Sequence, residues 1–130
     1  MIWYHYVSFF FGGAFLANAI PHLVSGVMGR AFQSPFAKPP GEGLSSSTVN
    51  VVWGAFNVAV AYVLLCQVGT FDLRNVGHVA VTGLAAVACS TFCAKHFGRF
   101  HGGNGPLAAP ADVVRSAGGH AHREFSGLDR

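Results

Sequence analysis

Two histidines in apolar segments, His22 and His96, have the side chains and spacing to hold a cofactor. Imidazole nitrogens bind haem iron and metal ions, and Cys93 lies one helical turn before His96 as a third donor. The pair therefore indicates a b-type haem or a metal as one reading. A second haem would need His5 and His78, and His78 lies about 27 Å along the helix from His96, at the water boundary.

The two histidines also belong to a larger group of polar side chains within apolar segments. Polar groups in hydrocarbon cost several kcal/mol unless they are paired, so these side chains are expected to face one another. A hydrogen-bonded packing network with no cofactor and no metal is the favoured interpretation, and a haem, a metal, or a lipid or quinone pocket are the alternatives. The predicted intramembrane cluster comprises Asn18, His22, Asn50, Asn57, Cys93 and His96.

Covalent catalysis has weak support in the sequence. Cys89 and Cys93 share a helical face with His96, which places a thiol near a base. The apolar segments contain no carboxylate to orient the imidazole, and nothing marks an oxyanion site. A phosphate-binding loop with its lysine is also missing from the sequence. We therefore expect a protein that is not an enzyme.

The composition indicates a membrane protein. Of the 130 residues, 52% are hydrophobic and 10% are charged, whereas about a quarter of a soluble domain is charged. The net charge is +3, but lysine and arginine are dispersed along the chain and do not form a basic patch. Lipid is therefore the predicted surrounding medium, and nucleic acid is not a predicted partner.

Three runs without charged residues predict an all-α integral membrane bundle of three transmembrane helices. The runs are 1–29, 43–71 and 75–94, and the spans within them are about 3–28, 48–68 and 76–96. Twenty helical residues rise roughly 30 Å, which is the thickness of the hydrocarbon core. A cleaved signal peptide ending near Ala19 is the alternative for the first run, but no lysine or arginine precedes the apolar region.

Small and polar residues follow one face of each predicted helix at steps of three and four. Such faces allow close packing between membrane helices. The third helix has further small residues on other faces, so we expect it to be the most enclosed. The three stripes are Ala14, Asn18, His22, Ser25 and Gly29; Ser47, Asn50, Gly54, Asn57 and Ala61; and His78, Thr82, Ala85, Cys89, Cys93 and His96.

The first connection, about 29–47, is rich in proline and glycine and therefore cannot be a regular helix. Prolines stiffen its backbone, and two phenylalanines are expected to dip into the membrane interface. One interpretation is a docking surface for a partner, and the other is a plain loop that stops two helices. The docking residues would be Phe32, Pro35, Phe36, Lys38, Pro39 and Pro40.

The basic residues near the span ends predict the orientation. Arg30 and Lys38 flank the first connection, and Lys95 and Arg99 follow the third span, whereas Arg74 stands alone in the second connection. Positive charge collects on the cytoplasmic side. The N-terminus is therefore expected outside, with a flexible cytoplasmic tail over 100–130, and a bacterial inner membrane is the expected location.

The leading functional hypothesis is a non-catalytic accessory or scaffold subunit of a larger membrane complex or homo-oligomer. Its basis is the area of small-residue surface, which exceeds what one three-helix contact needs. The alternative is a membrane anchor subunit that binds haem, a metal or a quinone through His22 and His96. Lipid and other membrane subunits, or further copies of the chain, are the expected partners.

Overall fold

Three long helices make up most of the computed structural model, which describes residues 2–105. Helix α1 spans Trp3–Val27, α2 spans Ser47–Tyr62 and continues as a π-helical turn, η1, over Val63–Gln67, and α3 spans Val76–His101. The segments Trp3–Val27, Ser47–Gln67 and Val76–His101 are each long and apolar enough to cross a membrane. This confirms the prediction of three long apolar helices and is compatible with an integral membrane location.

Polar side chains cap the N-terminal ends of two helices, close to the predicted first residues of those helices. The hydroxyl of Ser46 accepts a hydrogen bond from the Val49 N–H, and the Asn75 side chain caps the first N–H groups of α3. Gly102 caps the C-terminal end of helix α3, and its φ of 76° is a left-handed conformation that favours glycine. Helix α3 therefore runs beyond its predicted end at residue 96 and includes the first residues of the predicted tail. The remainder of that tail, 106–130, lies outside the described residues.

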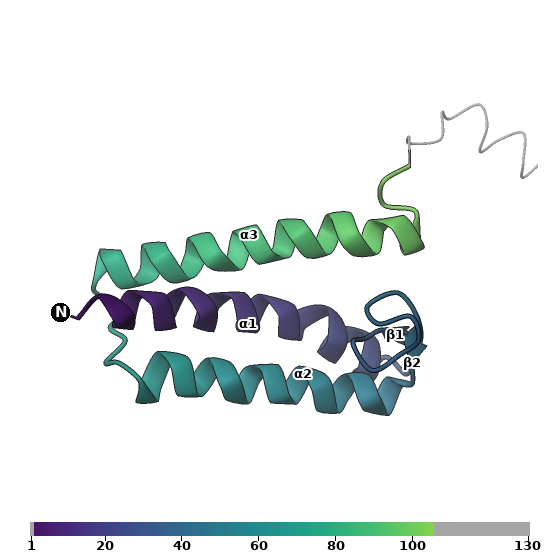
Figure 1. Ribbon diagram of the computed structural model, residues 1–130, viewed down its shortest axis with the longest axis horizontal. Coiled ribbons are helices and arrows are strands. Elements are labelled where there is room, and N and C mark those ends of the chain that lie inside the picture. The colour runs from purple at the N-terminus through teal and green to yellow at the C-terminus, as the bar shows by residue number, and fades with distance from the viewer. Residues whose placement is uncertain (1, 106–130) are drawn as a thin grey trace, which may run out of the picture.

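Helix α1 lies between α2 and α3 and packs against both of them, whereas α2 and α3 barely touch (Figure 1). Of the apolar stretch in α1, 39% is buried, compared with 22% for Ser47–Gln67 and 11% for α3. The expectation that the third helix would be the most enclosed is therefore wrong. Several of its small residues, Gly83 among them, face outward, and lipid accepts small and large apolar side chains alike.

Glycines allow α1 to approach both neighbours closely. A Cβ atom on Gly13 would collide with the backbone carbonyl oxygen of Thr82 in α3. On the other side of α1, a Cβ atom on Gly26 would lie 2.8 Å from the Ser47 carbonyl oxygen. Four of the five residues of the predicted stripe of α2 are buried, namely Asn50, Gly54, Asn57 and Ala61, whereas Ser47 is half-buried.

The first connection folds over one end of the bundle and contains a short β-ladder, which the all-helical prediction missed. Strands β1 (Phe32–Gln33) and β2 (Leu44–Ser45) pair antiparallel, with Phe32 opposite Ser45. Between the strands, the Ser34 carbonyl oxygen accepts a hydrogen bond of 2.8 Å from the Gly41 N–H. The ladder and this bond fix the connection beside the C-terminal end of α3 (Figure 1).

His78 is buried at the end of the bundle opposite the first connection. Its Nδ1 accepts a hydrogen bond of 3.0 Å from the Asp72 N–H in the turn before α3. The ring packs against Phe9 and Phe71, with centroid distances of 4.7 and 5.8 Å. His78 is 1% exposed, so this histidine is part of the core and closes the second connection.

Candidate functional site

The geometry around Asn50 determines which nitrogen of His22 carries a proton. Asn50 lies in the first turns of α2, and its Nδ2 lies 3.0–3.2 Å from the carbonyl oxygens of Phe32, Ser45 and Ser46. Carbonyl oxygens only accept hydrogen bonds, so this atom is the amide nitrogen, and Oδ1 faces His22 Nδ1 at 2.8 Å. Nδ1 of His22 therefore donates, and in the neutral ring Nε2 is left as an acceptor.

The second predicted ligand, His96, has both ring nitrogens engaged. Its Nε2 lies 2.8 Å from the Gly41 carbonyl oxygen, so this nitrogen carries the proton and donates. Its Nδ1 is then the acceptor, 3.1 Å from Nη2 of Arg99. No lone pair of His96 is left for iron, so the two imidazoles do not fit a b-type haem as its two axial ligands.

A metal held by His22, His96 and Cys93 does not fit the described geometry either. Within residues 2–105, no three His, Cys, Asp or Glu side chains lie close enough together to bind a metal ion. The Cys93 thiol instead points to Asn18 Oδ1, at 3.9 Å.

The deeper members of the predicted cluster connect the three helices. Asn18 of α1 donates to Asn57 Oδ1 of α2 at 3.0 Å, and Asn57 Nδ2 donates to the Trp53 carbonyl oxygen at 2.7 Å. Together with the Cys93 contact, these bonds give each amide at least one partner across or along the bundle. Five of the six predicted cluster residues therefore lie in two hydrogen-bonded groups, His22 with Asn50 and Asn18 with Asn57 and Cys93. The sixth, His96, bonds Gly41 and Arg99 instead.

Two adjoining cavities occupy the space that α2 and α3 leave over α1. The first, which we call the polar cavity, has a volume of about 290 Å³ and lies beneath the connection. The second, the mid-span cavity, has a volume of about 320 Å³ and shares Asn18 and Trp53 with the first. The polar cavity is lined by Asn18, His22, Gln33, Ser34, Pro35, Gly41, Trp53, Phe92, Cys93, His96 and Phe97. The mid-span cavity is lined by Ala14, Phe15, Asn18, Trp53, Asn57 and Cys89.

Gln33 is one of the residues of the polar cavity that the sequence analysis missed. Its side chain is 3% exposed, and its Oε1 lies 3.0 Å from His101 Nε2. The amide nitrogen of Gln33 has no hydrogen-bond partner among residues 2–105. A lone glutamine in a proline-rich connection gives no periodic signal, and only the β-ladder turns it inward. The lining residues of the polar cavity thus include Gln33, which has a free donor, and His22, which has a free acceptor.

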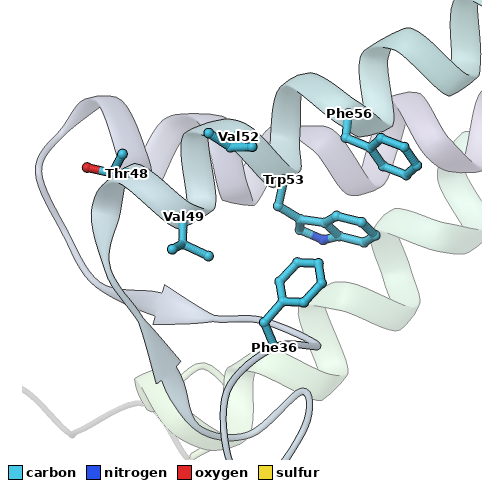
Figure 2. A pocket seen from close by; sticks show the side chains of 6 residues that line it. All are labelled: Phe36, Thr48, Val49, Val52, Trp53 and Phe56. Atoms are coloured by element: carbon cyan, nitrogen blue, oxygen red, sulfur yellow. The ribbon is translucent and has the colours of Figure 1, made fainter.

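A larger hollow lies outside this site, on the outer face of α2 (Figure 2). Its volume is about 680 Å³, and Thr48 is its only polar lining residue. Trp53 stacks on Phe56 and meets Phe36 edge to face, at centroid distances of 5.3 and 5.1 Å. Trp53 Nε1 is buried without a hydrogen-bond partner among the described residues, and Figure 2 shows it on the side of the indole that faces Phe36. The mostly apolar lining suits acyl chains.

The predicted docking residues fall into two sets. Phe32 is 8% exposed and packs on Phe97 and His101 with centroid distances of 4.7 and 5.4 Å, so a partner cannot reach it. The expectation that Phe32 lies in the interface is therefore wrong, because the β-ladder turns it into the bundle. The exposed docking residues are Pro35, Phe36, Lys38, Pro39 and Pro40.

Comparisons with protein-family models, with curated proteins and with solved structures find no match to this chain. The proposals below therefore rest on the geometry and chemistry of the chain itself.

Proposed function

We propose that the chain is a non-catalytic membrane protein that binds one small amphipathic molecule in the two adjoining cavities. The observation that carries this proposal is their arrangement: a cavity with amide and imidazole groups near the end of the bundle continues into a less polar one along the helices. Each volume is at the lower end of the usual range for small-molecule sites, which is about 300–1,000 Å³. A single ring with an alkyl tail suits this size.

The lining of the cavities supports binding over catalysis. Neither cavity is lined by an aspartate, glutamate, lysine or arginine. A buried ion would lack a counter-charge there, so a neutral ligand is favoured. The polar end of the ligand would lie beneath the connection, and its apolar part would follow α1 toward the middle of the span.

Replacing Ala14 with phenylalanine tests the proposed function. Ala14 lines the mid-span cavity, so the added ring occupies the space of the ligand. We expect the amount of small amphipathic molecule that copurifies in mild detergent, measured by mass spectrometry of an organic extract, to fall at least about tenfold.

Ala88→Phe is the matched control, because Ala88 is exposed on α3 and the added ring points away from both cavities. This variant should retain the copurifying molecule at the level of the parent protein. Circular dichroism and the elution volume show whether each variant is folded. Equal ligand content in folded Ala14→Phe and Ala88→Phe protein would contradict the proposal.

We propose as a second function that the first connection docks the chain onto another membrane subunit at the cytoplasmic face. The supporting observation is Phe36, which is 63% exposed although its backbone N–H is bonded to Ser34 Oγ at 3.1 Å. A large apolar side chain on a fixed turn is typical of docking surfaces. The connection and the C-terminal end of α3 lie at the same end of the bundle (Figure 1), so Arg30, Lys38, Lys95 and Arg99 would share the cytoplasmic side of a bacterial inner membrane.

A one-sided crosslinking experiment tests both the docking and the orientation. In the Lys95→Arg variant, Lys38 is the only lysine of the chain. We expect a membrane-impermeant amine crosslinker to give a higher-mass product with inverted vesicles, and adding Lys38→Arg should abolish this product. The N-terminal amine also reacts with the crosslinker, so the comparison uses only products that Lys38→Arg removes. A Lys38-dependent product from right-side-out vesicles would overturn the orientation, and monomer alone from inverted vesicles would overturn the docking.

A further inference from the structure

Two unpaired groups in the polar cavity specify the chemistry of the ligand's polar end. His22 Nε2 is an acceptor, because the proton on Nδ1 is fixed by Asn50. The Gln33 amide nitrogen is a donor, because Oε1 of the same amide is bonded to His101. A group that meets both must accept one hydrogen bond and donate another. A hydroxyl group does this with a single atom.

The walls of the polar cavity favour a flat ring beside that hydroxyl. Trp53 and Phe97 flank His22, with ring centroids 6.4 and 6.3 Å from the imidazole and interplanar angles of 78° and 86°. Phe92 lines the same cavity from α3. Aromatic pairs prefer such edge-to-face contacts, so a further ring gains favourable contacts on several sides. A volume of about 290 Å³ has room for one substituted ring.

The charge-free lining distinguishes a phenolic hydroxyl from other polar ends. A phospholipid head group or an ionised fatty acid would place a charge against Asn18, Gln33 and His22 with no cationic lining residue. Burying such a charge costs far more than burying a neutral hydroxyl. A quinone carbonyl accepts a hydrogen bond from Gln33 but has no proton for His22 Nε2, so the oxidised ring satisfies one group and leaves the other unpaired.

We infer that the ligand is an alkyl-tailed phenol, bound with its hydroxyl between His22 and Gln33 and with its tail in the mid-span cavity. This inference rests on the proposed function and adds the chemical class of the ligand. The hydroxyl donates to His22 Nε2 and accepts from Gln33 Nε2. The ring lies among Trp53, Phe92 and Phe97, and the tail leaves past Asn18 toward Ala14 and Cys89.

The experiment compares four decyl-tailed compounds by quenching of Trp53 fluorescence. The Trp3→Phe variant leaves Trp53 as the only tryptophan, and the protein is studied in lipid nanodiscs without oxygen. The compounds are a decyl hydroquinone, its dimethyl ether, the corresponding benzoquinone, and decanoic acid as the carboxylic alternative. We expect the hydroquinone to bind at least about tenfold more tightly than each of the others, since each of these lacks the neutral phenolic hydroxyl.

Gln33→Met and Gln67→Met separate the binding role of Gln33 from a general effect of losing an amide. Gln33→Met should weaken hydroquinone binding about tenfold, because it removes the amide that donates to the hydroxyl oxygen. Gln67 lies in η1 at the other end of the bundle, so Gln67→Met should leave hydroquinone binding within about twofold. Equal affinity for hydroquinone and ether in the parent protein, or tighter binding of the benzoquinone or decanoic acid, would overturn the inference. The inference also fails, while the proposed function stands, if none of the four compounds binds saturably but the parent protein retains a copurified molecule that Ala14→Phe loses.

Discussion

Replacing Asn50 with leucine is expected to lower the free energy of unfolding by about 3 kcal/mol. Leucine keeps the approximate volume but removes the amide that meets three carbonyl oxygens and His22 Nδ1. Each buried group left without a partner costs about 1–3 kcal/mol, although carbonyls that already accept a backbone hydrogen bond lose less. Equilibrium unfolding in mixed micelles with increasing dodecyl sulfate, followed by circular dichroism, measures the change.

Asn57→Leu is the matched control for this prediction. Asn57 is equally buried, but its amide nitrogen bonds the Trp53 carbonyl oxygen of its own helix, and its Oδ1 meets only Asn18. Hydrogen bonds between membrane helices average about 0.6 kcal/mol, so Asn57→Leu should cost about 1 kcal/mol. Equal losses in the two variants would show that Asn50 does not hold the connection to the bundle.

Replacing Gly13 with alanine is expected to separate α1 from α3 and to lower the free energy of unfolding by about 2–3 kcal/mol. The added methyl group would overlap the Thr82 carbonyl oxygen, and a backbone atom in a helix cannot move aside as a side chain can. Overpacking of this kind typically costs 1–3 kcal/mol. The same unfolding measurement gives the value, and a cysteine crosslink across α1 and α3 reports the separation directly.

Gly83→Ala provides the comparison for Gly13→Ala on the partner helix. A Cβ atom on Gly83 would meet nothing within 4 Å, so alanine adds helix propensity without a collision. The variant should be unchanged or more stable by about 0.5–1 kcal/mol. If Gly83→Ala proved as destabilising as Gly13→Ala, the outward face of α3 would have to be packed against another protein.

The sequence predicted the spans and the buried stripe of α2 because both follow from periodicity. In α2, large apolar residues such as Val and Phe occupy most of the other faces, whereas both amides lie on a single face. The sequence therefore identifies this face as the packed face. In α3 small residues occur on several faces, and the sequence alone does not say which of them meet protein and which meet lipid. The prediction of an enclosed third helix therefore failed, whereas its inward residues His78 and Ala85 were identified correctly.

The sequence predicted where in the bundle the candidate site lies, but not which of its groups donate and which accept hydrogen bonds. Spacing along the helices was enough to bring His22, Asn50 and His96 toward one end of the bundle. The proton positions depend on the carbonyl oxygens of Phe32 and Gly41, which lie in the connection, where no period constrains the backbone. The same connection contributes Gln33 to the cavity, and its Gly41 carbonyl oxygen occupies Nε2 of His96. The helical periodicity therefore could not predict the hydrogen-bonding groups of the cavity.

The central position of α1 also has a consequence for how the protein is made. A chain emerges from the ribosome with its N-terminus first, so α1 is made before the two helices that pack on it. Each later helix thus meets its packing surface as soon as it is made, and neither has to displace the other.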